Sequence, residues 1–497
     1  MIRLTLAEIT AITGGQCHGD DTVAVTGPVV VDSRRAEPGS LFAALPGEHA
    51  DGHDFAPAAA AKGAVAVLGT RPVAVPPGGG LPTVVVPDVT TALAALAHAV
   101  LGRLPGATVV GITGSSGKTS TKDLTGQVVE RLGPTIAPEG SFNNEIGLPL
   151  TVLRADEQTK YLVLEMSARG IGHIAELCGI APPRIGAVLN VGRAHAGEFG
   201  SMEGVAKAKG ELPEAVPADG VAILNAADPR VIAMRNRTKA RVVTFAAPAG
   251  VTGDPGVTGD PGGTGDAAGT REPGVTADFT AEDVILDDLG RASFRLVTPA
   301  GSAPVTLKLF GPHHVANALA AAAIAAELGM AAGDIADALS AATARSKKRM
   351  ELHERPDGVI VVNDAYNANP DSMRAAIEAL AHMTKNGTGQ GRRGIAVLGH
   401  MAELGDIDTE SHEEAGRLAA QAGVAALVAV GDDARPVLDG ARAQPGWTGE
   451  AIAVPDARSA VAAVRNELQP GDVVLVKASK AAGLWEVADG LLTETDR

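Results

Sequence analysis

The chain has 497 residues, too many for a single hydrophobic core, and this length predicts about three domains. Hydrophobic residues make up 45% of the chain, whereas aromatic residues make up 2% and leave few rings on which bases could stack. The net charge of −16 and the lack of any Lys/Arg-rich run argue against nucleic acid as a partner.

Cysteine usage and hydropathy favour a cytoplasmic location. Cys17 and Cys178 are too few for a disulfide framework and lack the spacing of metal ligands. The first residues carry an early acid and lack the apolar core of a signal peptide. The most apolar helical segment, 315–330, is short and interrupted by Asn317 and Glu327, so we expect no membrane span.

Residues 1–105 predict a small N-terminal α/β domain. Loops rich in Pro, Gly and Asp separate short apolar runs at Pro28–Val31, Leu41–Leu45, Ala64–Leu68 and Thr83–Val86. Ser33 and Arg34 follow the first run closely, and strand ends are where α/β sheets usually place ligands. Turn chemistry alone explains the polar loop Asp51–Phe55 about as well as a ligand site does.

A second domain is predicted to begin after Gly106, where an apolar strand pattern leads into a glycine-rich loop and then a helix. In this arrangement backbone N–H groups and the positive end of the helix face phosphate oxygens. Lys118 would reach the terminal phosphates, and the Thr119 hydroxyl would hold Mg²⁺. The expected phosphate-binding positions are Gly114, Ser115, Ser116, Gly117, Lys118, Thr119 and Ser120.

The loop departs from the strict Walker pattern, because Ile112 stands where that pattern has glycine. It is a Thr-Gly-x-x-Gly-Lys-Thr variant. An ordinary strand-to-helix turn is the alternative interpretation, but the flanking strand and helix favour a nucleoside triphosphate site.

Residues 106–345 predict a central domain built on a parallel sheet covered on both faces. Apolar strands alternate with helical segments, at Tyr161–Glu165, Ile185–Asn190, Val221–Leu224 and Arg241–Phe245. Residues 250–276 contain Val-Thr-Gly-Asp-Pro-Gly twice and predict a disordered surface insertion, because this composition cannot bury a core. A hairpin formed by 279–286 and 292–297 is expected to follow.

Residues 346–497 predict a doubly wound, Rossmann-like C-terminal domain. Strands are expected at Gly358–Val362, Gly394–Leu398, Ala425–Val430, Ala451–Val454 and Asp472–Val476, with helices between them. The segment lacks the glycine fingerprint of dinucleotide sites, so NAD is not indicated. The whole chain is therefore predicted to be an α/β protein of three domains, with the phosphate loop in the central one.

Two residues are expected beside the phosphate loop. Glu165 ends one predicted strand and His195 lies just past the end of the next, and such strand ends converge on one crevice of a parallel sheet. With Thr119 they would make a Mg²⁺ environment, although Mg²⁺ generally prefers oxygen to nitrogen ligands. From the residues alone, a structural or solvated role explains each equally well.

Two further polar segments, around Asn143 and around Lys209, contain candidate residues. Asn143 and Asn144 could bind a peptide substrate or shape a turn. Lys209 lies in a segment whose pattern is that of a solvated helix face.

Three polar residues lie at the start of a predicted alanine-rich helix. Helix capping would explain His313, His314 and Asn317 there. The loop 364–370 follows a strand, precedes a helix and is unusually polar. It also holds Tyr366, one of only two tyrosines in the chain.

Together these blocks resemble the Mur ligases, the amide ligases of peptidoglycan synthesis. The resemblance extends from Asp32 to Glu486, apart from the insertion, and rests on Thr113–Thr119, Asn143–Gly147, Tyr366–Pro370 and Met401–Gly405. The asparagine block and Met401–Gly405 look most like family members that add D-alanyl-D-alanine. The resemblance implies a monomeric, three-domain, ATP-dependent enzyme that joins UDP-N-acetylmuramoyl-tripeptide to D-alanyl-D-alanine through an acyl phosphate.

The resemblance also implies roles for single residues. Ser33 and Arg34 would lie near the uridine nucleotide. Glu165 and His195 match Mg²⁺ ligands, and Lys209 matches a lysine carried as a carbamate, an anion able to hold a second Mg²⁺. These three residues and Lys118 would form the catalytic set. Asn317 matches an adenine contact. The remaining substrate or nucleotide positions are Asn143, Asn144, Arg349, Asp364, Tyr366, Asn367 and Asn369.

Other classes of protein remain open on these grounds. A nucleotide-switched binding or motor protein would share the phosphate loop but has no use for Lys209 or the Tyr366 loop. A sister Mur ligase or a folylpolyglutamate-type enzyme should lack the block Asn143–Gly147. Compared with the family pattern, His314 replaces Asn, His400 replaces Asp and Lys480 replaces Arg. A hinge is expected within Ala341–Lys348, because the site must exclude water from a reactive intermediate.

Overall fold

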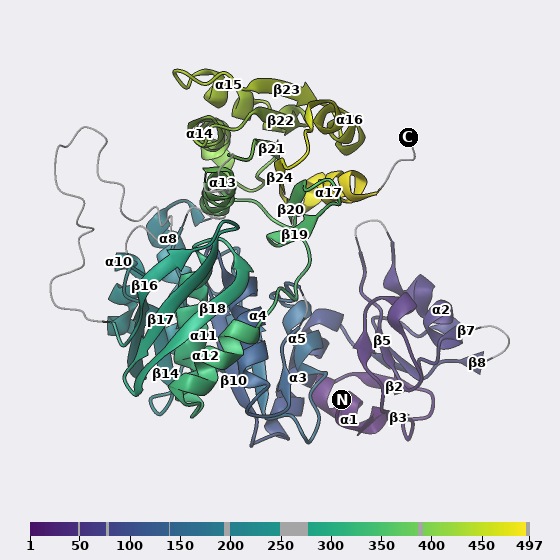
Figure 1. Ribbon diagram of the computed structural model, residues 1–497. Coiled ribbons are helices and arrows are strands. Elements are labelled where there is room, and N and C mark those ends of the chain that lie inside the picture. The colour runs from purple at the N-terminus through teal and green to yellow at the C-terminus, as the bar shows by residue number, and fades with distance from the viewer. Residues whose placement is uncertain are drawn as a thin grey trace.

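The computed structural model describes residues 1–47, 50–75, 79–138, 140–192, 199–248, 277–385 and 391–493. Its three main sheets have five, nine and six strands and follow one another along the chain. Figure 1 shows the central sheet at the lower left, the C-terminal sheet above it and the N-terminal sheet at the lower right. The predicted α/β fold with N-terminal, central and C-terminal sheets is confirmed.

The N-terminal sheet has the strand order β2-β9-β6-β5-β4, and β2 alone runs antiparallel to its neighbour. Its strands are β2 (Gln16–His18), β4 (Val29–Val30), β5 (Leu41–Ala43), β6 (Ala66–Gly69) and β9 (Thr83–Val85). Helix α1 (Leu6–Thr13) begins at a capping box in which Thr5 and Glu8 bond reciprocally. Helix α3 (Val89–Gly102) begins at Asp88 and packs on the central part of the chain.

The central sheet has the order β11-β12-β10-β13-β14-β15-β16-β17-β18 and is mixed. Its strands are β10 (Thr108–Thr113), β11 (Thr135–Ile136), β12 (Tyr161–Glu165), β13 (Ile185–Val188), β14 (Val221–Asn225), β15 (Arg241–Ala246), β16 (Phe279–Leu286), β17 (Arg291–Thr298) and β18 (Gly301–Phe310). The pairs up to β15–β16 are parallel, as predicted, and the predicted hairpin extends the same sheet as an antiparallel edge. Strand β18 was not predicted.

One face of the central sheet is covered by α4 (Lys118–Val129), α11 (His314–Glu327) and α12 (Ala332–Ala341). Six of the eight alanines of α11 are fully buried, which lets this helix approach both α4 and the sheet closely. Other helices of this part of the chain are α5 (Gly147–Val152), α6 (His173–Ile180), α8 (Met202–Lys209), α9 (Glu211–Ala215) and α10 (Pro229–Ile232).

The C-terminal sheet has the order β19-β20-β24-β21-β22-β23, and all its pairs are parallel except β19–β20. Its strands are β19 (Glu351–Glu354), β20 (Ile360–Asp364), β21 (Gly394–Gly399), β22 (Ala426–Val430), β23 (Glu450–Val454) and β24 (Val473–Lys477). Helices lie on both faces: α13 (Pro370–Lys385), α14 (Asp408–Gln421), α15 (Pro436–Arg442), α16 (Ala457–Glu467) and α17 (Trp485–Leu492). Separate apolar clusters on the two faces agree with the predicted doubly wound fold.

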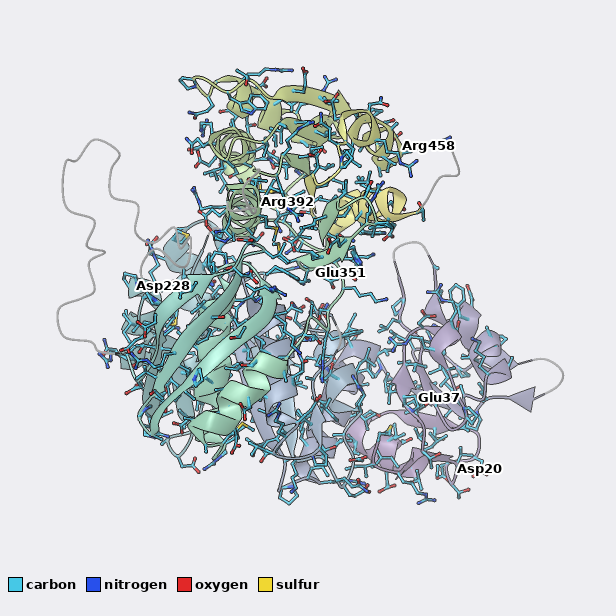
Figure 2. The ribbon with its side chains drawn as sticks, in the orientation of Figure 1. Asp20, Glu37, Asp228, Glu351, Arg392 and Arg458 are labelled. Carbon is cyan, nitrogen blue, oxygen red and sulfur yellow. The ribbon has the colours of Figure 1, made fainter. Side chains whose placement is uncertain are left out.

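The chain crosses from the central to the C-terminal sheet just before Glu351, which Figure 2 labels between the two. The side-chain amide of Gln127 on α4 bonds both the N–H and the C=O of Thr343, at 3.0 and 2.8 Å. Arg345 forms a bidentate pair with Glu130 at 2.5 and 2.6 Å. The first half of the connection is therefore fixed to α4.

Among the described residues no helix is long and apolar enough to cross a membrane. The insertion predicted at 250–276 and His195 both lie outside the described residues.

Candidate active site

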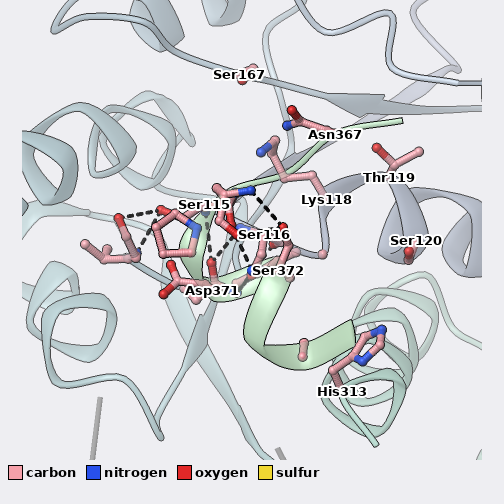
Figure 3. Close-up of a pocket in the computed structure, with 18 of the residues that line it drawn as sticks. Ser115, Ser116, Lys118, Thr119, Ser120, Ser167, His313, Asn367, Asp371 and Ser372 are labelled. Atoms are coloured by element: carbon pink, nitrogen blue, oxygen red, sulfur yellow. Dashed lines mark hydrogen bonds between the residues drawn. The ribbon is translucent and has the colours of Figure 1, made fainter. Parts of the chain in front are cut away.

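A cavity of about 1080 Å³ lies between the carboxyl ends of the central strands and the C-terminal sheet domain. The phosphate loop and other residues of the central part line it on one side, and residues of the C-terminal part line it on the other. Figure 3 shows Asn367, Asp371 and Ser372 of the C-terminal part facing Ser115, Ser116 and Lys118 of the loop. The sequence-predicted site residues in its lining are Ser115, Ser116, Gly117, Lys118, Thr119, Ser120, Asn143, Asn144, Glu165, Asn317, Arg349, Asp364, Tyr366, Asn367 and Asn369.

The loop joins β10 to α4 and turns at Gly117, whose φ of +75° suits glycine. Lys118 folds back, and its Nζ donates to the Gly114 carbonyl at 2.8 Å. Contrary to expectation, the N–H groups of Ser115 and Ser116 do not face open space, because both donate to Asn190 Oδ1 at 2.9 and 3.0 Å. The N–H groups of the first turn of α4 have no intrahelical acceptor and remain available for an anion.

A chain of hydrogen bonds surrounds Glu165, which is 1% exposed at the end of β12. Its Oε2 accepts from the Thr119 hydroxyl at 2.8 Å, and its Oε1 accepts from Asn143 Nδ2 at 2.7 Å. Ser141 Oγ lies 2.8 Å from Thr119 Oγ1 and accepts from Arg349 Nη2 at 2.8 Å. The structure thus brings together Thr119, Glu165 and Asn143, which lie far apart in the sequence.

Lys209 is the last residue of α8 and is 4% exposed. The interpretation as a solvated helix face is therefore wrong for Lys209, whereas it holds for the exposed Lys207. Two residues along a helix is more than half a turn, so the two lysines point in different directions. Burial, with a further contribution from the charge of Lys118, lowers the pKa of Lys209 well below its ordinary value.

The C-terminal sheet contributes a second polar group. Strands β20 and β24 pair in register so that Asp364 stands beside Lys477, and their side chains meet at 2.6 Å. Lys477 Nζ also donates to the Asn367 carbonyl at 3.0 Å, which fixes the polar loop 364–370. The guanidinium of Arg349 lies 4.4 Å from the centre of the Tyr366 ring, in a cation–π contact.

Capping does not explain the histidines at the start of α11. His313 stands at the N-cap position without a side-chain cap bond, and its buried Nδ1 has no partner among the described residues. Burial lowers the pKa of His313 to about 4 and that of His314 well below its ordinary value. Asn317 is 6% exposed, and its Oδ1 accepts from Thr121 Oγ1 at 3.2 Å beside the turn of the loop. His313 and Asn317 line the cavity, whereas His314 does not.

Other predicted residues lie apart or have local partners. Ser33 and Arg34 belong to the N-terminal sheet domain and do not line the cavity, and Arg34 pairs with Asp32 at 2.8 Å. Asn144 Oδ1 accepts from the Gly147 N–H at 2.9 Å, so here the turn-shaping interpretation describes the contact.

Sequence reasoning missed Asn190, Ser141 and Lys477. Asn190 and Lys477 end apolar strand patterns, and the rule that placed Glu165 at such an end could have found both. Ser141 stands within a polar block that was singled out for its asparagines, and nothing in its pattern distinguishes it.

A smaller cavity of about 450 Å³ adjoins the first on the C-terminal side. It is lined by Asn367, Ala368, Asn369, Ala402, Glu403, Ser479, Lys480, Ala481 and Trp485. Asn367, Asn369, Glu403 and Lys480 line both cavities, so the two are immediate neighbours. The smaller one combines alanine methyls with one acidic and one basic side chain.

Three family models match the chain. They describe a Mur ligase middle domain at residues 112–325, a Mur ligase glutamate ligase domain at 348–480 and a Mur ligase family catalytic domain at 28–101. A UDP-N-acetylmuramoyl-tripeptide--D-alanyl-D-alanine ligase of Mycobacterium tuberculosis is 47% identical over 99% of this chain and 98% of its own. A ligase of the same name from Escherichia coli is 35% identical over 99% of both chains.

Solved structures agree. A crystal structure of MurF from Acinetobacter baumannii aligns with a TM-score of 0.81 at 29% identity, over 99% of both chains. A MurF ligase from Thermotoga maritima in complex with ADP aligns with a TM-score of 0.74 at 27% identity, over 94% of this chain and 97% of that one.

Proposed function

This chain belongs to the Mur ligase family, and on that basis we propose that it joins D-alanyl-D-alanine to UDP-N-acetylmuramoyl-tripeptide in cell-wall peptidoglycan synthesis, with ATP as the energy source. The observation that carries the proposal is full-length identity of 47% to a ligase of that name. ATP as the nucleotide is supported by the phosphate loop and by the ADP complex of a MurF relative.

A free carboxylate does not react with an amine at neutral pH, because it is ionised and lacks a leaving group. The tripeptide carboxylate attacks the γ-phosphorus of ATP, which gives an acyl phosphate and ADP. Lys118 and the first-turn N–H groups of α4 hold the charge on the transferring oxygens. The amine of D-alanyl-D-alanine then attacks the activated carbonyl carbon, loses a proton and expels phosphate.

Thr119 and Glu165 fit a Mg²⁺ site. Both are hard oxygen donors, they lie 2.8 Å apart, and the buried carboxylate has only neutral hydrogen-bonding partners in Thr119 and Asn143. Bound there, Mg²⁺ neutralises charge that develops on phosphate oxygens. His195 is proposed as a further ligand and lies outside the described residues.

Lys209 fits a carbamate. An amine adds to carbon dioxide only when it is neutral, and the lowered pKa of Lys209 supplies the neutral form. The product is an anion that the charge of Lys118 would attract, whereas the same charge disfavours the protonated amine. Such an anion provides oxygen ligands for a second Mg²⁺.

The substrates divide between the parts of the chain. The N-terminal domain, 1–105, holds the uridine nucleotide near Ser33 and Arg34. The central domain, 106–345, holds the ATP phosphates. Asn317 contacts adenine, and the C-terminal domain, 346–497, closes on the nucleotide. We place the reaction in the cytoplasm, with the protein acting as a monomer. Arg349, Asp364 and Tyr366 meet the nucleotide, and Asn143, Asn144, Asn367 and Asn369 meet the peptides.

The smaller cavity suits the acceptor dipeptide. D-alanyl-D-alanine is a zwitterion with two methyl side chains. Lys480 offers a partner for its carboxylate, and the alanines in the lining leave room for methyl groups. The two cavities share four lining residues, and this proximity would let the amine reach the activated carbonyl.

Phosphate release from ATP tests the function. We expect release only when UDP-N-acetylmuramoyl-tripeptide and D-alanyl-D-alanine are both present, together with a pentapeptide product detected by mass spectrometry. Release that is indifferent to both substrates would make the protein a phosphate-loop ATPase of another class.

A further inference from the structure

Ser141 lies in the loop between β11 and α5 and contacts the two parts of the site that come from different sheets. Its Oγ lies 2.8 Å from Thr119 Oγ1 in the central part and 2.8 Å from Arg349 Nη2, which belongs to the connection before β19. Like Thr119 and Arg349, it lines the large cavity.

The protons that these side chains can donate fix the direction of each hydrogen bond. Thr119 has one hydroxyl proton and donates it to Glu165 Oε2. Thr119 Oγ1 therefore accepts the proton of Ser141, and Ser141 Oγ accepts from Arg349, which can only donate. The series runs from Arg349 through Ser141 and Thr119 to Glu165. The hydrogen bond from Ser141 uses one of the two lone pairs of Thr119 Oγ1 and leaves the other for a cation.

Arg349 lies beyond the part of the connection that is fixed to the central domain. The last fixed residue is Ser346, whose N–H donates to Asp123 Oδ2 at 2.9 Å and whose Oγ accepts from the Gly140 N–H at 3.1 Å. Past it, Met350 N–H donates to Asp364 Oδ1 at 3.1 Å in the C-terminal sheet. The contact between Ser141 and Arg349 therefore spans the short segment between the two sets of anchoring contacts, where we expect the hinge.

We propose that Ser141 is a positioning residue: it orients the metal-binding hydroxyl of Thr119 and makes that orientation depend on Arg349 and so on the placement of the C-terminal domain. The role rests on the proposed Mg²⁺ site. It explains how domain closure and metal binding are coupled without any contact between Ser141 and the peptide substrates.

Mn²⁺ serves as the probe, since its free concentration can be measured by electron paramagnetic resonance with ADP present. We expect Ser141→Ala to weaken Mn²⁺ binding about five-fold, the factor that corresponds to one neutral hydrogen bond. Ser141→Thr keeps the hydroxyl and should bind within two-fold of wild type. Ser293→Ala is the matched control, because it removes another hydroxyl–hydroxyl contact, 3.1 Å long, on the edge of the sheet.

A double-mutant cycle tests the link to the C-terminal domain. In an Arg349→Ala background, Ser141→Ala should weaken Mn²⁺ binding by less than in wild type, since the series is already broken. Unchanged Mn²⁺ affinity in Ser141→Ala, or strictly additive effects with Arg349→Ala, would overturn the proposal. The assay needs no peptide substrate, so that result would leave the proposed ligase function standing, whereas failed ligation by wild type would not affect the Mn²⁺ result.

Discussion

Lys207 and Lys209 show how little a local pattern says about one side chain. Both belong to the same charged helical stretch, yet Lys207 is exposed and Lys209 is buried. The difference arises from tertiary packing of α8, which a sequence pattern does not contain. Glu165 could be placed from the sequence because a strand end has a fixed position in a parallel sheet.

Carbamylation of Lys209 gives a direct prediction. With ¹³C-labelled bicarbonate, wild type should give a carbamate signal in the ¹³C NMR spectrum, and Lys209→Gln should not. We expect Lys209→Gln to lower kcat by about 100-fold or more, as loss of a charge-stabilising group does. Lys207→Gln, two residues away and exposed, should keep both the signal and the activity. A carbamate signal that survives in Lys209→Gln would refute the assignment.

His313 predicts a change of stability with pH. Its pKa is about 4 in the folded protein, against 6.5 for the free side chain. Between these values the unfolded chain binds a proton that the folded chain does not, so stability falls as pH drops from 6.5 towards 4. We expect His313→Gln to reduce this loss of unfolding free energy by about 1–2 kcal/mol. The full pKa shift would give more, but the ring is partly exposed and solvent weakens the effect. Urea unfolding at pH 7 and pH 4.5 measures it.

At the scale of elements, the turn into α4 requires glycine. Gly117 has a φ of +75°, and a Cβ there would lie 2.6 Å from Asn317 Oδ1. Gly117→Ala should lower the free energy of unfolding by about 1–3 kcal/mol and weaken ATP binding. Gly179→Ala in α6, where a Cβ meets nothing, should be neutral or stabilising by up to about 1 kcal/mol. Thermal unfolding and nucleotide titration measure both, and equal effects of the two changes would contradict the account.

Most strands could be predicted from the sequence to within a residue or two, because buried parallel strands are continuous apolar runs. Two of the strands that escaped prediction, β18 and β19, have another pattern. Residues of β18 alternate between buried and exposed, and β19 is Glu-Leu-His-Glu, mostly polar. The central sheet is mixed because the hairpin joins its edge. A local sequence pattern does not show which sheet a hairpin joins.

At the scale of the molecule, the placement of the C-terminal domain could not be predicted. Asn369 Nδ2 lies 3.5 Å from the Ser115 carbonyl, and Arg349 reaches Ser141. Contacts of this kind depend on how two separately folded sheets meet. The family resemblance implied a nucleotide role for Arg349 and a substrate role for Asn369, whereas the residues alone implied neither.

At this scale we predict that the C-terminal domain closes when substrates bind. Small-angle scattering should show compaction when ATP and the uridine substrate are bound. Lys347→Pro fixes one backbone dihedral between the two sets of anchoring contacts, and we expect it to reduce both compaction and kcat, while Lys347→Ala should not. Wild type that keeps the same radius of gyration with and without ligands would contradict a hinge within Ala341–Lys348.

The most direct test of the central claim, that the tripeptide carboxylate is activated by phosphoryl transfer, is an isotope measurement. UDP-N-acetylmuramoyl-tripeptide labelled with ¹⁸O in its reacting carboxylate is incubated with ATP and D-alanyl-D-alanine, and the released phosphate is analysed by mass spectrometry. The account predicts that one carboxylate oxygen leaves with the phosphate. Unlabelled phosphate, formed together with the pentapeptide product, would contradict it.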